Sequence, residues 1–254
     1  MRLLEALSRS SAAMTLTDLA ADADMPMSKA HRYLVSLVRC RLVSQDAATG
    51  RYDLGTLSLG MGLTALGRID AVGIATEALP RLRDRVDETA VLAVWGEHGA
   101  TVIRFEESVH PVRMNVRVGS VLPFANSAIG QIFAAYLPET VVRDALAREV
   151  TGGAGGNRKG AFDRRRFDKI RADVRKRGLN RNVGTFIPGV SAMAAPVLDH
   201  QDQIAAVIGV LGHQVSLDTA WNGPVAEALR HHASEVSLRL GAKDRMDNQS
   251  GRTR

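Results

Sequence analysis

The pattern of apolar and polar positions in residues 15–54 predicts two short helices followed by a β-hairpin. Thr15 suits a helix N-cap, and the apolar residues after it recur at helical spacing along one side of a first short helix. Pro26 suits the first turn of a second helix, because its missing N–H would have no partner there. Residues 42–44 and 51–54 are strand-like runs joined by a polar turn that ends in glycine. This order and these lengths are typical of a winged helix-turn-helix.

Residues 27–39 separate on a helical wheel into an apolar side and a side rich in cations and hydroxyl groups. The apolar side holds Met27, Ala30, Leu34, Leu37 and Val38, and the opposite side holds Ser28, Lys29, Arg32, Ser36 and Arg39. We expect Met27, and with it Tyr33, to belong mainly to the core. The second helix of such a motif enters the major groove, where its N-terminal side chains reach base edges.

An outer side rich in lysine and arginine is more often only a solvated face, so the second helix alone does not decide between that interpretation and DNA binding. The capped first helix, the proline-started second helix and the hairpin together favour DNA binding. His31 lies at the border of the two sides, where a packed, hydrogen-bonded histidine and a base contact are equally good interpretations. The candidate DNA contacts are Thr17, Met27, Ser28, Lys29, His31, Arg32, Ser36 and Arg51. We expect Lys29 and Arg32 to contact bases or phosphates, and the hairpin with Arg51 to reach the DNA backbone or the minor groove.

Residues 55–68 are apolar on several sides and predict a helix that links the winged segment to the rest of the chain. The glycines at 60 and 62 resemble a degraded dinucleotide-binding fingerprint, but no strand precedes them, so close helix packing is the better interpretation. Helical spacing continues over residues 70–87, where Pro80 indicates a kink.

From residue 90 the apolar period changes from helical to alternating, which predicts a mixed domain with antiparallel strands. The expected elements are strands at 90–95, 101–105 and 112–118, helices at 128–136, 139–149 and 162–177, a hairpin of buried strands at 190–198 and 204–212, and a final helix from 224 to 240. We expect Asn126 and Ser127 to cap the first of these helices. Residues 151–160 form a Gly-rich connector, because they lack the Gly-Lys-Ser/Thr ending of a phosphate loop.

The chain of 254 residues carries a formal net charge of +6, which is compatible with a polyanionic partner. Most of this excess lies in residues 162–177, where a solvated helix face is the usual interpretation and a second nucleic-acid surface is the lesser alternative. The single cysteine, Cys40, excludes an internal disulfide framework and a cysteine-rich zinc site. No apolar run reaches membrane-spanning length, so we expect a cytoplasmic protein without a membrane partner.

No catalytic constellation is visible in the sequence. The seven histidines are scattered, and the adjacent pair His231 and His232 would point about 100° apart on a helix. The chain has no Gly-x-Ser-x-Gly elbow and no His-Glu-x-x-His motif. We therefore expect no enzyme activity, no cofactor and no metal site. The alternative is an enzyme or a small-molecule-binding protein whose helical N-terminus serves only for assembly.

Four segments resemble the IclR family of bacterial transcriptional regulators, and the resemblance covers nearly the whole chain. Residues 27–34 (MSKAHRYL) resemble the family's recognition helix, and residues 51–55 (RYDLG) resemble its wing exit. Residues 122–131 (LPFANSAIGQ) resemble the loop that enters a core helix, and residues 188–197 (PGVSAMAAPV) complete the set. The resemblance implies a winged DNA reader, a GAF-like domain that binds a small organic acid, and a dimer or dimer of dimers on a pseudo-palindromic operator.

The resemblance also implies an effector pocket. Its candidate residues are Met114, Ser127, Ala128, Ile129, Gly130, Asn182, Val190, Ala192, Gly209 and Leu211. Backbone N–H groups at the start of the helix after Ser127 suit a carboxylate. Where family members that bind small keto acids have an aspartate, a cysteine and two serines, this chain has Asn182, Ala192, Gly209 and Leu211. These exchanges favour a larger or aromatic acid over a very small polar one.

The sequence therefore predicts an α+β protein with four parts. These are a winged helix-turn-helix at 1–54, a linker helix at 55–69, a GAF-like effector-binding domain with an antiparallel sheet at 70–240, and a disordered tail at 241–254. The predicted function is a ligand-responsive repressor of catabolic or metabolic genes that binds double-stranded operator DNA as a homodimer or dimer of dimers. Residues 1–68 carry only eight Lys or Arg against six Asp or Glu, so one reader alone should bind DNA weakly.

Overall fold

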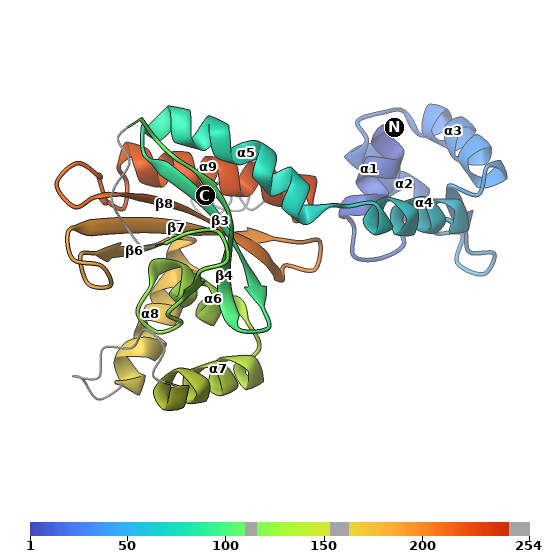
Figure 1. The fold of residues 1–254 in the computed structure, drawn as a ribbon. Coiled ribbons are helices and arrows are strands. Elements are labelled where there is room, and N and C mark those ends of the chain that lie inside the picture. Colours follow the sequence, from blue (N-terminus) through green and yellow to red (C-terminus); the bar gives the residue numbers. More distant parts are fainter. Residues whose placement is uncertain (110–115, 153–162, 244–254) are drawn as a thin grey trace. The chain divides into compact units, whose positions relative to one another are not determined.

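The chain forms two compact units, Met1–Ile69 and Asp70–Arg254, in a computed structural model that describes residues 1–109, 116–152 and 163–243 (Figure 1). Within these residues no single helix is long and apolar enough to cross a membrane. The consecutive helices at 56–67 and 71–86 meet that requirement only when they are counted together.

The first unit has the predicted order of helix, turn, helix and hairpin. Its elements are α1 (Arg2–Arg9), α2 (Leu16–Asp22), α3 (Met27–Arg39), β1 (Val43–Gln45), β2 (Tyr52–Leu54) and α4 (Thr56–Gly67). The hydroxyl of Thr15 accepts the backbone N–H of Asp18 at 3.2 Å, so the predicted cap of α2 is confirmed. Strands β1 and β2 pair antiparallel and form the wing.

The core of the first unit leaves out two residues of α3 that the sequence pattern assigned to it. Ala30 and Leu34, one turn apart, are fully buried in a cluster with residues of α1 and α2. Met27 and Tyr33 are each 51% exposed, so the expectation that they pack in the core is wrong. Met27 is the first residue of the helix and lies beyond the core, and Tyr33 is turned about 100° from Leu34 around the helix axis.

The second unit is a six-stranded antiparallel sheet with helices on both faces (Figure 1). The strand order is β5-β4-β3-β8-β7-β6. Its elements are α5 (Ala71–Val86), β3 (Thr89–Gly96), β4 (Gly99–Glu106), β5 (Val121–Leu122), α6 (Ala128–Tyr136), α7 (Glu139–Gly152), α8 (Arg164–Arg177), β6 (Asn180–Val183), β7 (Val190–Leu198), β8 (Ile204–His213) and α9 (Pro224–Arg239). Helices α5 and α9 cover one face, and α6 packs on the other with α8 against it. The predicted α+β class is confirmed.

Some local predictions for this unit differ from the structure. Residues 116–118 are not in a strand, and the edge strand β5 lies at Val121–Leu122 instead; residues 112–115 lie outside the described residues. Strand β6 was not expected, because its sequence Asn-Arg-Asn-Val is polar and it lies at a sheet edge. Helix α7 extends to Gly152, and the rest of the predicted Gly-rich connector lies outside the described residues, as does the predicted tail from residue 244 onward.

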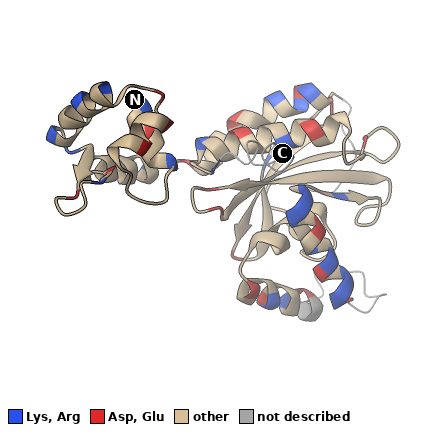
Figure 2. Cartoon of the chain, turned by 180° about the vertical axis from the view of Figure 1, so that it is seen from behind, with Lys and Arg blue, Asp and Glu red and all other residues tan. Residues whose placement is uncertain are grey.

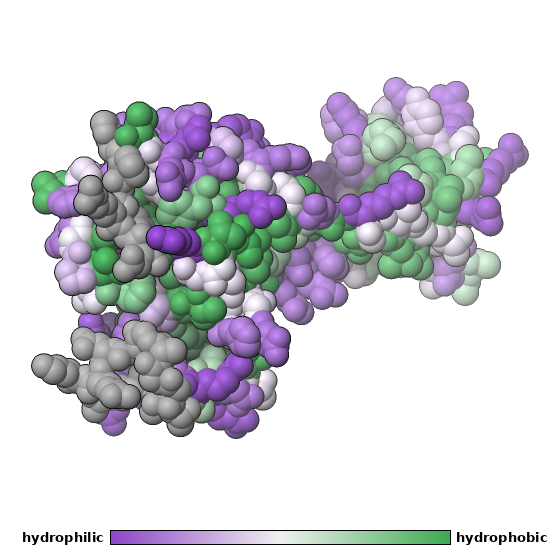
Figure 3. Space-filling view, viewed as in Figure 1, coloured by the Kyte–Doolittle hydropathy of each residue, from purple (hydrophilic) through white to green (hydrophobic). Residues whose placement is uncertain are grey.

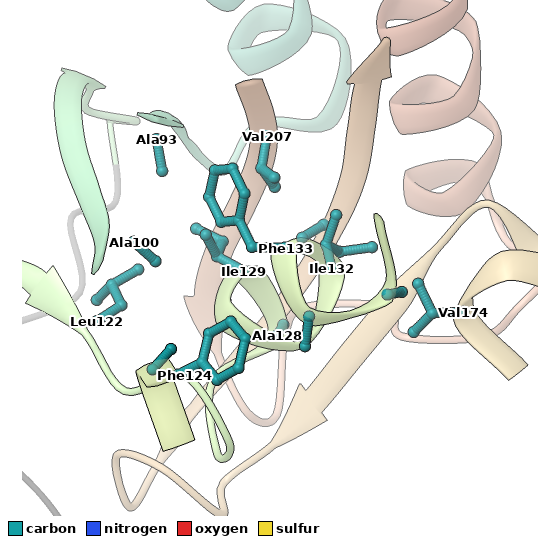
Figure 4. Close-up of a cluster of buried hydrophobic side chains, with 14 of the residues drawn as sticks. Ala93, Ala100, Leu122, Phe124, Ala128, Ile129, Ile132, Phe133, Val174 and Val207 are labelled. Atoms are coloured by element: carbon teal, nitrogen blue, oxygen red, sulfur yellow. The ribbon is translucent and has the colours of Figure 1, made fainter. Parts of the chain in front are cut away.

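Helix α6 is the buried centre of the second unit. Eight of its nine residues are buried between the sheet and α8. Phe133 and Ile132 are fully buried in the cluster that Figure 4 shows. Gly130 permits a close approach, because a Cβ there would lie 2.7 Å from Phe124 Cα and would also collide with the Pro123 carbonyl oxygen. The loop before α6 therefore packs directly on the helix backbone.

We expect Gly130→Ala to destabilise the protein by about 1–3 kcal/mol, because the added methyl group meets backbone atoms that cannot move aside. Ala172→Ser is the matched control, since it also adds one heavy atom inside a helix, but at an exposed position of α8. The control should cost no more than about 0.5 kcal/mol from helix propensity. Urea unfolding followed by circular dichroism measures both variants, and equal stabilities would contradict the packing account.

Candidate DNA-binding surface and effector cavity

The outer side of α3 carries most of the predicted DNA contacts. Ser28, Lys29, His31 and Arg32 are exposed, as is Ser36 one turn later. Figure 2 shows the basic residues of this helix in blue. Within the described residues, Lys29 and Arg32 take part in no salt bridge, so their charges are available to a partner. The exposure of His31 argues against a packed histidine. A side with these groups has the chemistry of a major-groove helix.

The remaining predicted DNA contacts are Thr17, Met27 and Arg51, and all three are exposed. Thr17 is exposed on α2, and its hydroxyl donates to the Met27 sulfur at 4.0 Å. Arg51 is exposed just before β2, and its Nη1 donates to the Ala13 carbonyl at 3.0 Å. This bond fixes the direction of the Arg51 side chain at the base of the wing.

The turn of the wing is held by its own side chains. The Asp46 carboxylate accepts the backbone N–H groups of Thr49 and Ala48, each at 2.8 Å. The bond from Thr49, followed by that from Ala48, lowers the pKa of Asp46 below its ordinary value. Gly50 closes the turn in the left-handed region, with φ of 68°, which glycine adopts without strain. These hydrogen bonds and Gly50 therefore give the turn of the wing a defined conformation.

A cavity in the second unit lies between the sheet and the start of α6. Its empty volume is about 460 Å³, part of which is open to solvent. The lining residues are Val91, Val102, Val116, Leu122, Ser127, Ala128, Ile129, Asn182, Phe186, Ile187, Val190, Ala192 and Leu211. Only Ser127 and Asn182 in this set have polar side chains, so the cavity suits a ligand with an apolar body.

The N-terminus of α6 forms the polar end of this cavity. The Ser127 hydroxyl accepts the N–H of Gly130 at 2.9 Å and donates to the Pro123 carbonyl at 2.6 Å, so the predicted cap is confirmed. The N–H groups of Ala128 and Ile129 belong to the first turn and have no carbonyl partner within the helix. Both residues line the cavity. These N–H groups and the positive end of the helix dipole suit a ligand carboxylate.

Asn182 joins the two rims of the cavity. Its Nδ2 donates to the Asn126 carbonyl at 2.6 Å, on the loop before α6. Its Oδ1 accepts the N–H groups of Thr185 and Phe186 at 3.1 and 3.2 Å, and the Thr185 hydroxyl at 2.8 Å. These bonds occupy its oxygen and one of its N–H groups. The Asn182 side chain therefore mainly connects two loops, and it leaves one N–H group for a ligand in the cavity.

The cavity brings together seven of the ten predicted effector residues, which are Ser127, Ala128, Ile129, Asn182, Val190, Ala192 and Leu211. Gly130 and Gly209 do not line it, and Met114 lies outside the described residues. A Cβ at Gly209 would lie 3.1 Å from Val91 Cγ2 and 3.2 Å from Ile129 Cδ1. The absent side chain of Gly209 therefore leaves room for Val91 and Ile129, which both line the cavity.

Six apolar residues line the cavity and were not predicted from the sequence. They are Val91, Val102, Val116, Leu122, Phe186 and Ile187. The first four have the pattern of ordinary core residues, and no signal in the sequence separates them from the rest of the core. Phe186 and Ile187 did carry a signal, because an apolar pair directly before Pro188-Gly189 is unusual for a solvated loop.

The basic helix α8 uses several of its arginines within the second unit. Arg171 and Arg164 contact the Glu139 carboxylate at 2.8 and 2.7 Å, and these bonds, that of Arg171 first, lower the pKa of Glu139. Arg171 and Arg175 also donate to carbonyl oxygens in the last turn of α6. These contacts favour a packing role for this side of α8 over its role as the main nucleic-acid surface.

Within the described residues, no group of three or more histidine, cysteine, aspartate or glutamate side chains is placed to hold a metal ion. The rings of His231 and His232 meet edge to face with centroids 5.3 Å apart. Nδ1 of His232 is also hydrogen-bonded to the Ala228 carbonyl at 2.8 Å, so this histidine is engaged inside α9.

Both units of the chain match known protein domains. Residues 1–47 match the IclR helix-turn-helix domain, and residues 63–238 match the bacterial transcriptional regulator IclR C-terminal domain. The chain is 27% identical over 214 residues to the transcriptional repressor IclR of Escherichia coli, which covers 84% of this chain and 77% of the repressor.

Two solved structures extend the comparison. The crystal structure of Pseudomonas aeruginosa HmgR is 38% identical, has a TM-score of 0.87, and covers 95% of this chain and 96% of its own. An IclR homologue from Microbacterium hydrocarbonoxydans, complexed with 4-hydroxybenzoate, is 21% identical with a TM-score of 0.57 over 94% of this chain and 96% of its own, and shares the fold. Because both domain models match in order and together span nearly the whole chain, this protein belongs to the IclR family of bacterial transcriptional regulators.

Proposed function

We propose that this regulator binds operator DNA through α3 and the wing, and that an acid with an apolar or aromatic body alters its DNA affinity from the cavity beside α6. The observation that carries the proposal is the combination of apolar walls with unpaired N–H groups at the start of a buried helix. An aromatic acid fits both, with its ring on the walls and its carboxylate at the helix N-terminus. The protein acts in this account by binding and not by catalysis.

The cavity favours a ring-bearing acid over a very small polar acid. Ala192 and Leu211 offer no hydrogen bonds, and the Asn182 side chain is largely engaged with its neighbours. A small polar acid would leave its remaining oxygens unpaired against these walls, which costs binding free energy. The 4-hydroxybenzoate bound by the Microbacterium homologue is an acid of the class that we propose.

Helix α4 supports the pairing of two chains. None of its residues is buried, and its exposed apolar side chains are Leu57, Leu59, Met61, Leu63 and Leu66. Figure 3 shows hydrophobic surface where α4 lies in Figure 1. A helix that is apolar on all sides needs cover, and a second copy of α4 supplies it through a two-fold contact. Two paired readers then match the two halves of a pseudo-palindromic operator.

Effector and DNA are coupled in this proposal through the arrangement of the two readers. An effector changes DNA affinity only if it binds two arrangements of the protein unequally. Curated relatives include transcriptional repressors, so we assign repression to this chain as well. The acid would then favour the arrangement with the lower affinity for the operator.

A titration of the purified protein against DNA from upstream of its own gene tests the whole proposal. It is done at two salt concentrations, with and without a panel of aromatic and keto acids. Specific binding should weaken steeply with salt, because neutralised phosphates release counterions. One aromatic acid should shift the operator-binding curve to higher protein concentration. No selective binding under any condition would favour a binding protein or enzyme whose helical N-terminus serves assembly.

Arg32→Ala should lower operator affinity by about 1–3 kcal/mol if Arg32 reads a guanine edge. Arg143→Ala is the control, because Arg143 is also an exposed arginine and lies on α7 in the other unit. Fluorescence anisotropy with labelled operator DNA measures both variants. An unchanged titration for Arg32→Ala would remove this residue from the interface.

Ala128→Phe should abolish the response to the acid and leave operator binding intact, because its ring would fill the cavity at the helix N-terminus. Ala172→Phe, on the exposed side of α8, adds the same bulk elsewhere and should respond normally. Operator titrations with and without the acid compare the two. A surviving response in Ala128→Phe would show that the effector binds at another place.

The double variant Leu59→Asp with Leu63→Asp should dissociate the pair and weaken operator binding by about tenfold or more, because two charges cannot be buried between apolar helices. Val215→Asp is the control, since Val215 is 88% exposed in a loop of the second unit. Analytical ultracentrifugation measures the mass of the protein in solution, and fluorescence anisotropy measures its affinity for operator DNA. A variant that keeps the wild-type mass would exclude this face of α4 from the dimer contact.

A further inference from the structure

The loop of residues 123–127 connects β5 to α6 and determines where the first N–H groups of α6 lie. Its carbonyl oxygens are held from two sides. The Gln131 side chain donates to the Ala125 carbonyl at 2.6 Å, and the Asn182 side chain donates to the Asn126 carbonyl at 2.6 Å. The carbonyl groups of the loop are thus fixed by α6 and β6.

The N–H groups of the same loop are held by a side chain from α7. Oε2 of Glu149 accepts the backbone N–H of Phe124 and that of Ala125, each at 3.0 Å. One oxygen atom therefore fixes two consecutive peptide groups. The carboxyl group is half-buried, and burial raises its pKa while the bonds from Ala125 and Phe124 act in the opposite direction. Glu149 is therefore part of the loop's structure and not a solvated surface charge.

The ring of Phe124 gives the loop a second, apolar anchor. It meets the Trp95 ring edge-on with centroids 5.2 Å apart and lies 6.0 Å from the Phe167 ring. Figure 4 shows Phe124 near the start of α6, close to Ala128. Loss of the Glu149 bonds would therefore loosen the backbone of the loop without releasing the loop altogether. A loosened backbone is enough to disturb N–H groups that must be aimed at an anion.

We propose that Glu149 is a positioning residue of the effector site, which holds the loop so that the N–H groups of Ala128 and Ile129 are aimed at the ligand carboxylate before it arrives. This inference rests on the proposed effector function. Glu149 does not line the cavity, so it acts through the loop and not by touching the ligand. Donors that are already ordered bind more tightly, because their ordering costs nothing at the moment of binding.

Three substitutions of Glu149 test in turn the acceptor oxygen, the length of the side chain and its charge. Glu149→Ala removes the acceptor. Glu149→Gln keeps an acceptor oxygen at the same reach and removes the charge, whereas Glu149→Asp keeps the charge and withdraws the oxygen by one methylene group. A positioning role predicts that Gln rescues the site and that Asp does not. Asp144→Ala is the matched control, because Asp144 is an exposed carboxylate on the same helix.

Hydrogen exchange followed by mass spectrometry tests the loop without any ligand. In Glu149→Ala and Glu149→Asp, the peptide that contains residues 124–127 should exchange about tenfold faster, because the N–H groups have lost their acceptor. Glu149→Gln and Asp144→Ala should match the wild type, and peptides from α9 should not change in any variant. Unchanged exchange of the loop in Glu149→Ala would overturn the proposal.

Calorimetry with 4-hydroxybenzoate as the probe tests the effect on the site. Affinity should fall about tenfold in Glu149→Ala and Glu149→Asp and stay near the wild type in Glu149→Gln. The operator affinity without acid should stay unchanged, and the thermal midpoint should fall slightly in Glu149→Ala and Glu149→Asp and return to the wild-type value in Glu149→Gln. A lowered midpoint that Gln does not rescue would mean a merely structural role and would overturn the proposal.

The same experiment separates this inference from the function on which it rests. If Ala128→Phe abolishes binding of the acid while Glu149→Ala binds normally, the effector site stands and the role of Glu149 is rejected. If the wild type binds neither 4-hydroxybenzoate nor any other aromatic acid of the panel, the proposed effector class fails. The exchange comparison then decides alone whether Glu149 positions the loop.

Discussion

A helix that is buried along almost its whole length must find partners for the polar groups at both of its ends, and this constraint shapes the second unit. The first N–H groups and the last carbonyl groups of α6 cannot bond within the helix. Arg171 and Arg175 supply donors at the C-terminal end. Ser127 satisfies one N–H at the other end. The residues that carry the remaining N–H groups line an apolar cavity, so the anion site that we propose follows from how the helix is buried.

The sequence could predict those features that depend on residues close together in the chain. The caps at Thr15 and Ser127 are hydrogen bonds to residues three positions later, and both are present. Strands β7 and β8 are apolar runs joined by a short polar turn, and the structure pairs them in one long antiparallel hairpin. The family resemblance then added the placement of the cavity at the start of α6, which no local pattern indicates.

Features that depend on contacts between distant segments could not be predicted in this way. Met27 has the right periodicity for the core of the first unit, but the core ends before it. Strand β6 is polar and exists because it pairs with β7 at the edge of the sheet. Asn182 lines the cavity, but no pattern in the sequence indicated that its side chain would also bridge two loops. In each case the deciding neighbour is far away in the sequence.

Gly209 also limits what the wall of the cavity tolerates. A Cβ at this position would lie 3.1 Å from Val91 Cγ2 and 3.2 Å from Ile129 Cδ1, which is tighter than ordinary van der Waals contact. A larger residue at 209 therefore requires these two cavity-lining side chains to shift by a few tenths of an ångström. A substitution on β8 outside the cavity lining would thus change the shape of the cavity through Val91 and Ile129.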